Sequence, residues 1–281
     1  MPVTVWCSSP QVSVQGIQSQ ALKGPANLVI DRWGPPPFGT LLGTNAAPST
    51  LANFGGPDEA RWLTFHQIGN WREHDHYWYL SEIYHAQPSR PALNGEPYYP
   101  GFPDNNPPAH SEEAALNCRS GMYGSFLSGG FAGYIYGADG MWGGNIEPQA
   151  KYRIWDALAF QSGDQVRHLG TFVMKHGERY QDLIPDADLV TPNKTGPAIG
   201  YRGWAYCART PDKKIFLLYL EKDCPPVTVR SLIHDRKYTL TWFDPRTGEW
   251  SDGGVVVAGQ EGRACLPAPP TQDDWALSLT A

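Results

Sequence analysis

The hydrophobic pattern of the chain changes near residue 195, and this change constrains the fold more than any other feature. Before it, short apolar runs alternate with amphipathic helical stretches. After it, short strand-like runs follow one another with turn residues at intervals of about 8 to 12 positions. The first pattern is typical of a parallel sheet with helical crossovers, and the second of a small antiparallel sandwich. We therefore expect an α/β region over residues 1–195 and a β-sandwich over residues 196–281.

Two helices are expected among the strands of the first region. Ser111 is a candidate cap for a helix that has Glu112 and Glu113 in its first turn. A second helix is predicted over residues 155–176, ended by Gly177. The expected strands are the short apolar runs at residues 3–6, 27–30, 64–68, 91–94 and 131–136.

The composition excludes two classes of partner. The chain has 22 Lys and Arg residues against 28 Asp and Glu, a net charge of −6, so it lacks the long-range attraction that a nucleic-acid binder normally has. No run approaches the roughly 18 consecutive apolar residues of a bilayer-spanning helix. No basic stretch followed by an apolar one marks a signal peptide at the N-terminus. We therefore expect neither nucleic acid nor a membrane as a partner.

Candidate functional residues follow the expected strands. In parallel α/β architectures, function gathers at the carboxyl ends of the strands. These ends contain carboxylates, amides and aromatic rings, a combination that suits a polar, ring-shaped ligand such as a sugar. The residues are Asp31, Arg32 and Trp33; His66, Gln67 and Asn70; Asn94 and Glu96; and Tyr136, Asp139 and Trp142.

Glu96 is the most specific of these candidates. It follows a short apolar run in LNGEPYY, where Gly95 allows the chain to bend closely and Pro97 ends the ladder. In one interpretation Glu96 is a nucleophile or proton-transfer carboxylate at the mouth of a barrel. In the other it is a surface glutamate in a loop, or one paired with an arginine. Its position in the sequence does not decide between them.

No metal centre or cofactor is expected. His66 and the cluster His74, Asp75 and His76 lack a third ligand at a familiar spacing. The five cysteines contain no C-x-x-C pair, which argues against a zinc ribbon or a redox motif. The chain also lacks the G-x-S-x-G elbow, the Walker loop and the G-x-G-x-x-G fingerprint.

Three segments, in the correct order, resemble the second half of the apiosidase-like glycoside hydrolases. They are RPALNGEPYY, EEAALNCRSGMYGSFLSGGFAGYIYGADGMW and WDALAFQSGDQVRHLGTFVMKHGERYQDLIPD. The tail, with WFDPRTGEW, resembles the small β-sandwich, labelled collagen-binding, that usually follows such domains. The resemblance covers about residues 55–280. It implies a partial (β/α) TIM-type barrel followed by an antiparallel β-sandwich.

The resemblance also implies roles for several residues. Glu96 would stand at the end of the seventh barrel strand as the nucleophile of a retaining glycosidase. Tyr136, Asp139 and Trp142 would line the sugar pocket from strand eight. Tyr134 stands where family members commonly have a histidine, so substrate contacts there would differ. Family members are generally exported, which suggests an extracellular or periplasmic location.

The α/β region is short for a complete barrel. A (β/α)₈ barrel takes about 200 to 250 residues, whereas the region before the sandwich contains four or five expected strands. The acid/base carboxylate that the family has near the end of strand four has no visible counterpart. Asp139 and Asp31 are the candidates to replace it. We therefore expect that a second chain, a second copy or a rearranged fold completes the barrel.

Two functions remain open. The chain is either a retaining glycosidase that acts on O-glycosidic bonds of polysaccharides, or a non-catalytic carbohydrate-binding or structural subunit derived from one. A glycosidase of this type needs two carboxylates and no cofactor. The predicted catalytic residues are Glu96 and Asp139. The predicted substrate contacts are Asp31, Trp33, His66, Gln67, Asn94, Tyr136 and Trp142.

Overall fold

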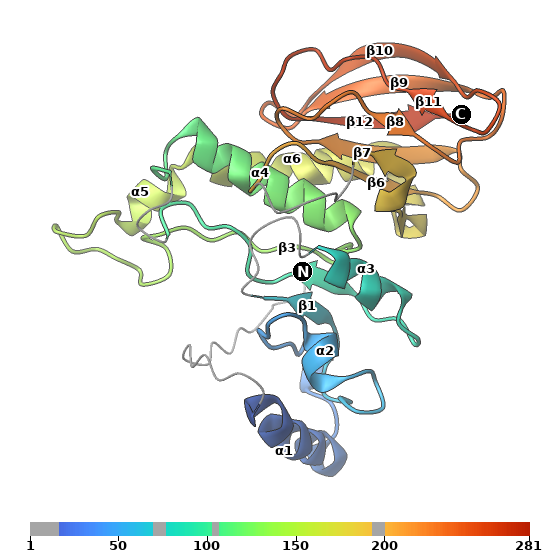
Figure 1. Ribbon diagram of the computed structural model, residues 1–281. Coiled ribbons are helices and arrows are strands. Elements are labelled where there is room, and N and C mark those ends of the chain that lie inside the picture. Colours follow the sequence, from blue (N-terminus) through green and yellow to red (C-terminus); the bar gives the residue numbers. More distant parts are fainter. Residues whose placement is uncertain (1–16, 70–76, 103–106, 193–199) are drawn as a thin grey trace.

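The computed structural model describes residues 17–69, 77–102, 107–192 and 200–281 (Figure 1). Helices and a small parallel sheet are followed by antiparallel strands, which confirms the expected order of an α/β region and a β region. The expected strand at residues 3–6, Asn70 and the cluster His74, Asp75 and His76 lie outside the described residues.

Three short strands form the parallel sheet. β1 (His66–Ile68) pairs with β2 (Ala92–Asn94), and β2 pairs with β3 (Gly133–Tyr134). They confirm three of the expected strands. Helix α3 (Trp78–His85) lies between β1 and β2 along the chain, and α4 (Glu112–Leu127) lies between β2 and β3. Parallel neighbours need such crossovers, because a tight hairpin reverses the strand direction.

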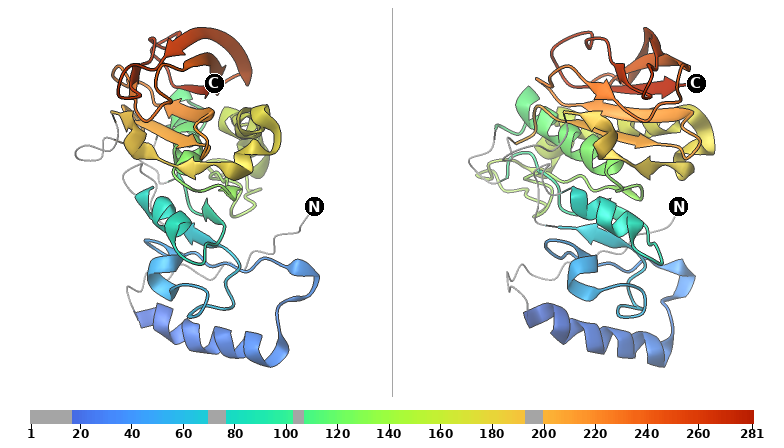
Figure 2. Two further views of the ribbon diagram at one scale, coloured as in Figure 1. Left: turned by 90° about the vertical axis from the view of Figure 1, so that its right-hand side faces the viewer. Right: turned by 45° about the vertical axis from the view of Figure 1, so that its right-hand side comes forward.

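The expected strand at residues 27–30 is wrong. These residues belong to helix α1 (Ile17–Trp33), which packs against the short helix α2 (Thr50–Phe54). A run of four apolar residues cannot by itself distinguish a strand from a helix. Figure 2 shows α1 at the end of the molecule that lies opposite the antiparallel strands.

Helix α4 is the central element of the α/β region. Ser111 caps it as expected, because its Oγ accepts a hydrogen bond from the Ala114 backbone N–H at 3.1 Å. From Ala114 to Leu127 every residue of this helix is buried. The cause is that α4 contacts the parallel sheet, helix α6 (Gln161–Val173) and strands of the antiparallel sheet.

The second expected helix is divided. The break falls at Phe160, which has an extended backbone and a buried side chain packed edge-on against Tyr152 at 5.3 Å between ring centroids. Gly177, the expected stop, has φ 59° in the left-handed region, which favours glycine. The pieces are α5 (Ile154–Leu158), α6 and the 3-10 helix η3 (Met174–Asp182). The described residues also form the 3-10 turns η1 (Pro37–Gly39) and η4 (Ala187–Leu189).

The antiparallel region contains two sheets. The larger has the order β10-β9-β12-β7-β6-β4, and the smaller has the order β11-β8-β5. The larger sheet is formed by β4 (Ile184–Pro185), β6 (Ala205–Arg209), β7 (Ile215–Leu220), β9 (Lys237–Asp244), β10 (Glu249–Val257) and β12 (Trp275–Thr280). The smaller sheet is formed by β5 (Val190–Thr191), β8 (Thr228–Val229) and β11 (Ala264–Cys265). The boundary near residue 195 stays a prediction, and β4 and β5 pair with strands that follow it.

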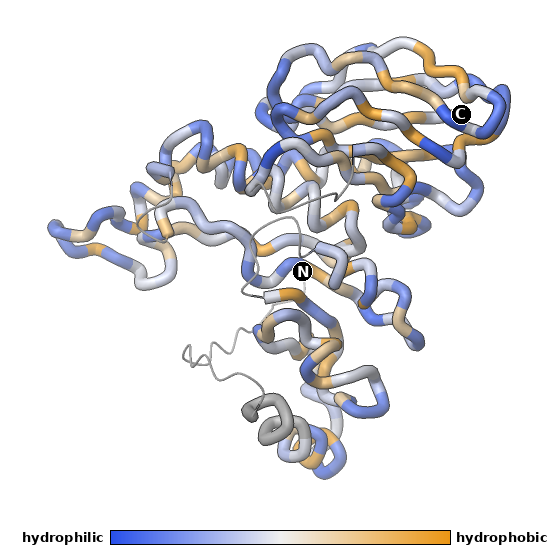
Figure 3. Tube along the Cα trace, viewed as in Figure 1, coloured by the Kyte–Doolittle hydropathy of each residue, from blue (hydrophilic) through white to orange (hydrophobic). Residues whose placement is uncertain are grey.

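The central strands of the six-stranded sheet are covered on both faces. All six residues of β7 are buried. Ile215, Leu217 and Tyr219 pack on the side of α4 and α6, whereas the alternate residues Phe216 and Leu218 pack toward the smaller sheet. Figure 3 shows hydrophobic stretches along these strands. Because both faces are buried, β7 reads as a continuous apolar run and not as an alternating one.

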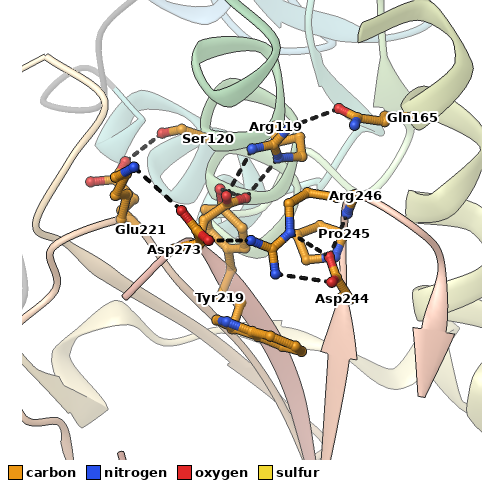
Figure 4. A network of polar contacts seen from close by, with 12 residues as sticks. Arg119, Ser120, Gln165, Tyr219, Glu221, Asp244, Pro245, Arg246 and Asp273 are labelled. Atoms are coloured by element: carbon orange, nitrogen blue, oxygen red, sulfur yellow. Dashed lines mark hydrogen bonds and ion pairs between the residues drawn. The ribbon is translucent and has the colours of Figure 1, made fainter. Parts of the chain in front are cut away.

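A buried ion pair joins the α/β region to the antiparallel sheet (Figure 4). Arg119 of α4 is 1% exposed. Its Nε and Nη2 donate to the carboxylate of Asp274, which precedes β12, at 2.8 and 2.9 Å. Tyr219 donates to the same carboxylate at 2.9 Å, and Arg119 also donates to Gln165 at 2.8 Å. These bonds satisfy both charges, which an unpaired buried ion could not achieve without a large penalty.

We expect Arg119→Met to lower the free energy of unfolding by about 3 to 5 kcal/mol, because Asp274 would remain buried without its partner. The control is Arg263→Met, which removes the exposed pair with Glu261 at 3.0 Å and should change stability by less than about 1 kcal/mol. Urea denaturation at neutral pH measures both. Equal effects of the two substitutions would contradict the assignment of Arg119 as the link between the regions.

Candidate functional site

The carboxyl ends of the three parallel strands lie side by side. Ile68, Asn94 and Tyr134 are partners in the sheet register. The residues that follow them, including Glu96 and Tyr136, therefore leave the sheet at the same edge. This edge is where parallel α/β folds place their functional groups.

Glu96 is buried at this edge, with 5% of its surface exposed. The side chain of Asn45, from the segment between α1 and α2, donates a hydrogen bond from Nδ2 to Glu96 Oε2. This amide fixes the orientation of the carboxylate. The burial excludes the interpretation of Glu96 as a solvated surface glutamate.

Two glycines make room for amides beside Glu96. A Cβ on Gly95 would lie 2.2 Å from Gln67 Oε1, and a Cβ on Gly69 would lie 1.7 Å from Asn45 Oδ1. Any larger residue would displace these side chains. Gln67 is further held by a hydrogen bond from its Nε2 to the Thr44 carbonyl. Gln67 and Asn45 thus pack tightly at the strand ends.

Asn94 is fully buried two residues before Glu96. Within the described part of the chain, neither its Oδ1 nor its Nδ2 has a hydrogen-bond partner. Leaving such groups unsatisfied costs about 1 to 3 kcal/mol. Unsatisfied buried polar groups are rare in folded proteins and call for a specific explanation, such as a functional role. The unsatisfied amide keeps Asn94, already predicted as a substrate contact, among the candidate site residues.

The loop after β3 packs against the loop after β2. The Trp142 ring lies edge-on to Tyr99 and Phe102, with centroid distances of 4.5 and 4.9 Å. The backbone N–H of Asp139 donates to the Pro100 carbonyl at 2.9 Å. Trp142 remains 50% exposed. These contacts bring the segment of Asp139 and Trp142 next to the segment that follows Glu96.

Tyr136 points its hydroxyl to helix α6. Its Oη lies 2.9 Å from Ser162 Oγ. Burial raises the pKa of Tyr136 to about 12, and the hydrogen bond with Ser162 opposes that shift. The phenol therefore stays protonated at neutral pH and positions the loop after β3 against α6.

Asp31 and Trp33 lie on helix α1 and do not follow a strand, so the reason for predicting them as substrate contacts was wrong. Asp31 forms an exposed ion pair with Arg61 at 2.6 Å. Trp33 is 71% exposed, and the Arg32 guanidinium lies 5.2 Å from its ring centroid. None of these contacts joins α1 to Glu96.

His66 begins β1 and so lies at the amino end of the strand, away from the edge that contains Glu96. It is 2% exposed, and its Nδ1 lies 2.9 Å from Thr50 Oγ1. Burial, together with the positive charge of Arg90, lowers the pKa of His66 to about 4. The imidazole is therefore neutral and acts in the packing of β1 against α2.

Two hollows lie elsewhere on the described part of the chain. One, of about 430 Å³, lies between α3 and the strands β4 and β6. The other, of about 290 Å³, lies beside His66 and Pro88. Glu96 lines neither of them. Among the described residues, no group of three or more His, Cys, Asp or Glu side chains could hold a metal ion, and no helix has the length and apolar character to cross a membrane.

The family model for the apiosidase-like catalytic domain matches residues 38–178, which is half of the chain. The chain belongs to the apiosidase-like family. The segment that matches contains Glu96 and the whole parallel sheet. A second model, described as the collagen-binding domain of a collagenase, matches residues 184–280 of the apiosidase-like chain.

Solved structures of glycoside hydrolases share the fold. One, described as a glycoside hydrolase, is 18% identical with a TM-score of 0.65, and the match covers 83% of the apiosidase-like chain and 55% of that chain. A glycoside hydrolase family 5 protein from Bacteroides vulgatus ATCC 8482 is 17% identical with a TM-score of 0.64, over 83% and 53% of the two chains. The apiosidase-like chain thus spans about half the length of these structures. No curated protein matches it.

We expect the protein to become less stable as the pH falls, because of the titration of His66. Its pKa is lower in the folded state than the value of about 6.5 in an unfolded chain, so protons bind preferentially to the unfolded state. The contribution is fully present above about pH 6.5 and declines as the pH falls toward 4. Between pH 7.5 and pH 5 it amounts to about 2 kcal/mol.

Urea denaturation at these two pH values measures the difference. His66→Gln should show a smaller loss of stability on acidification than the wild type. His110→Gln, which changes an exposed imidazole, should lose as much as the wild type. The same pH dependence in all three proteins would contradict the assignment.

Proposed function

We propose that this apiosidase-like chain hydrolyses O-glycosidic bonds of polysaccharides by a retaining mechanism, with Glu96 as the nucleophile. The observation that supports it is a buried, amide-oriented carboxylate at the carboxyl edge of a parallel sheet, in a chain of a glycoside hydrolase-like family. Glu96 attacks the anomeric carbon while a second carboxylic acid protonates the leaving oxygen. That second group then takes a proton from the water that cleaves the glycosyl-enzyme bond.

Asp139 is the proposed second carboxylate. Its backbone is hydrogen-bonded to Pro100 in the segment that follows Glu96, and it packs against Gly101. Retention requires the two carboxyl groups to be about 5 to 5.5 Å apart, so the two loops must bring Glu96 and Asp139 to that separation around the sugar. Asp31, the other sequence candidate, is bound by Arg61 on the side of α1.

The proposed substrate contacts belong to the three parallel strands or to the segments that follow them. Gln67 of β1 and Asn94 of β2 contribute buried amides near the carboxyl edge, and the unsatisfied Asn94 amide has both a donor and an acceptor for a sugar hydroxyl that reaches it. Trp142, half exposed beside Tyr99, provides an aromatic face for a sugar ring. No cofactor takes part in this mechanism.

We also propose that the parallel sheet is part of a (β/α) barrel that a second chain or a second copy completes. Parallel strands with helical crossovers and the likeness to glycoside hydrolase structures support it. Within the described residues, β1 and β3 are the outer strands of their sheet, and a closed barrel has no such edges. On α1, Leu28 and Trp33 are 67% and 71% exposed, which offers apolar surface for a partner. An extracellular or periplasmic location fits a substrate of this size.

The alternative is a non-catalytic carbohydrate-binding or structural subunit. One observation favours it: Glu96 is only 5% exposed, so little of its carboxylate is open to a substrate. Such a protein would bind a glycan or a partner chain without hydrolysing the glycan.

We expect Glu96→Gln to reduce the hydrolysis of plant and microbial polysaccharides by at least about 10²-fold, because an amide cannot form the glycosyl-enzyme bond. The fold should be retained, since glutamine keeps the size of the side chain and its contact with Asn45. Glu82→Gln, an exposed position on α3, should keep the wild-type rate. Release of reducing sugars measures all three proteins. A Glu96→Gln variant as active as the wild type would refute the assignment, and glycan binding without any release would favour the alternative.

If a second copy of the chain completes the barrel, we expect the protein to be a dimer in solution. Light scattering after size-exclusion chromatography should give about twice the 31.1 kDa mass of the chain. Trp33→Ser, on the exposed face of α1, should shift the equilibrium toward the monomer, whereas Trp155→Ser on α5 should not. A well-folded monomer with full glycosidase activity would show that no second chain is needed.

A further inference from the structure

The hollow of about 430 Å³ lies between the α/β region and the antiparallel sheets. Helix α3 lines one side, and η4, β4 and β6 line the other. Its volume falls within the range of about 300 to 1,000 Å³ that is usual for small-molecule sites, which form preferentially where two regions of a protein meet. None of its lining residues belongs to the carboxyl edge of the parallel sheet.

Buried aromatic rings form part of the wall of this hollow. Tyr77, Trp204 and Tyr206 are each less than 7% exposed. Tyr206 lies 6.0 Å from Tyr77 and 6.4 Å from Trp204 between ring centroids. Rings that are packed in this way keep their position, so the wall is preformed. A preformed wall lowers the entropy cost of binding a ligand.

Trp78 stands at the same hollow but is 45% exposed. Its ring is stacked on that of Tyr79, with a centroid distance of 3.7 Å. This stacking holds a large flat surface at the rim. The apolar faces of pyranose and furanose rings pack well against such surfaces.

Polar groups of both signs complete the lining. Arg209 donates from Nε to Asp186 at 3.1 Å, and both side chains are only about one fifth exposed. Asp188 is exposed nearby. A guanidinium paired with a carboxylate offers donors and acceptors in one plane, which suits neighbouring hydroxyls. Because the guanidinium is already paired with a carboxylate, it offers little attraction to phosphate or carboxylate ligands.

We propose that this hollow is a second saccharide-binding site that takes neutral sugar units, with Trp78 as the stacking residue and the Arg209–Asp186 pair as the hydroxyl-binding group. The choice of a saccharide rests on the proposed function of the chain. The site itself is separate from Glu96. It would therefore bind either another segment of the same polysaccharide molecule or a neighbouring polysaccharide molecule.

Calorimetric titration of the whole chain tests this site in the Glu96→Gln background, where a substrate is not consumed. The probes are neutral cello- and xylo-oligosaccharides and the anionic galacturono-oligosaccharides. We expect neutral probes to bind, and Trp78→Ala to weaken the binding at this site by about tenfold or more. Trp155→Ala is the matched control, because Trp155 is 48% exposed on α5 and does not line the hollow. It should leave the affinity unchanged.

Three results would overturn the proposal: neutral probes that do not bind, equal affinities of the Trp78→Ala and Trp155→Ala variants, or binding of the anionic probe alone. If the chain does not hydrolyse polysaccharides, the experiments give a different result. In that case the protein with Glu96 intact releases no sugar, whereas the loss of binding in Trp78→Ala persists. The two proposals can therefore fail independently.

Discussion

The buried pair of Arg119 and Asp274 is the interaction on which the arrangement of the two regions depends. A guanidinium and a carboxylate without solvent tolerate little displacement, because each would lose hydrogen bonds that water cannot replace. Arg119 belongs to α4, and this helix connects the end of β2 to the start of β3. The antiparallel sheet therefore fixes the helix that connects two strands of the candidate site. The sandwich is a structural support of the site as well as a domain with its own family match.

The surroundings of Glu96 show how backbone space and side-chain amides together position one carboxylate. Gly69 and Gly95 lack the Cβ atoms that would collide with Asn45 and Gln67. The Asn45 amide in turn holds the carboxylate of Glu96. Such a carboxylate loses little conformational freedom when it reacts, and preorganisation of this kind is a general contribution to catalysis. The close approach of Gln67 accounts for the glycine before Glu96 better than a turn requirement alone does.

The sequence predicted those features that have local causes. The cap at Ser111 and the strands before Glu96 and Tyr136 follow from side-chain types within a few residues, and the structure contains them. Residues 27–30 of helix α1 were predicted as a strand because four apolar residues have no readable period.

The partners of the site residues could not be predicted. Asn45 contacts Glu96 across 51 positions, and no motif surrounds it. The burial of His66 and its hydrogen bond with Thr50 also depend on tertiary packing. The residues next to His66 in the sequence therefore could not show whether it lies at the ligand-binding edge. Strand β10 has no continuous apolar pattern in the sequence, because Gly253 and Gly254 interrupt it at a bulge.

The double coverage of the six-stranded sheet limits what the antiparallel region can recognise. The broad surfaces of its central strands are occupied, one by α4 and α6 and the other by the smaller sheet. A long fibrous molecule such as collagen or a polysaccharide strand therefore cannot lie flat across these central strands. Contact with such a fibre would use surface outside them, such as the border of the sheet, where Val255 and Val257 of β10 are 61% and 54% exposed.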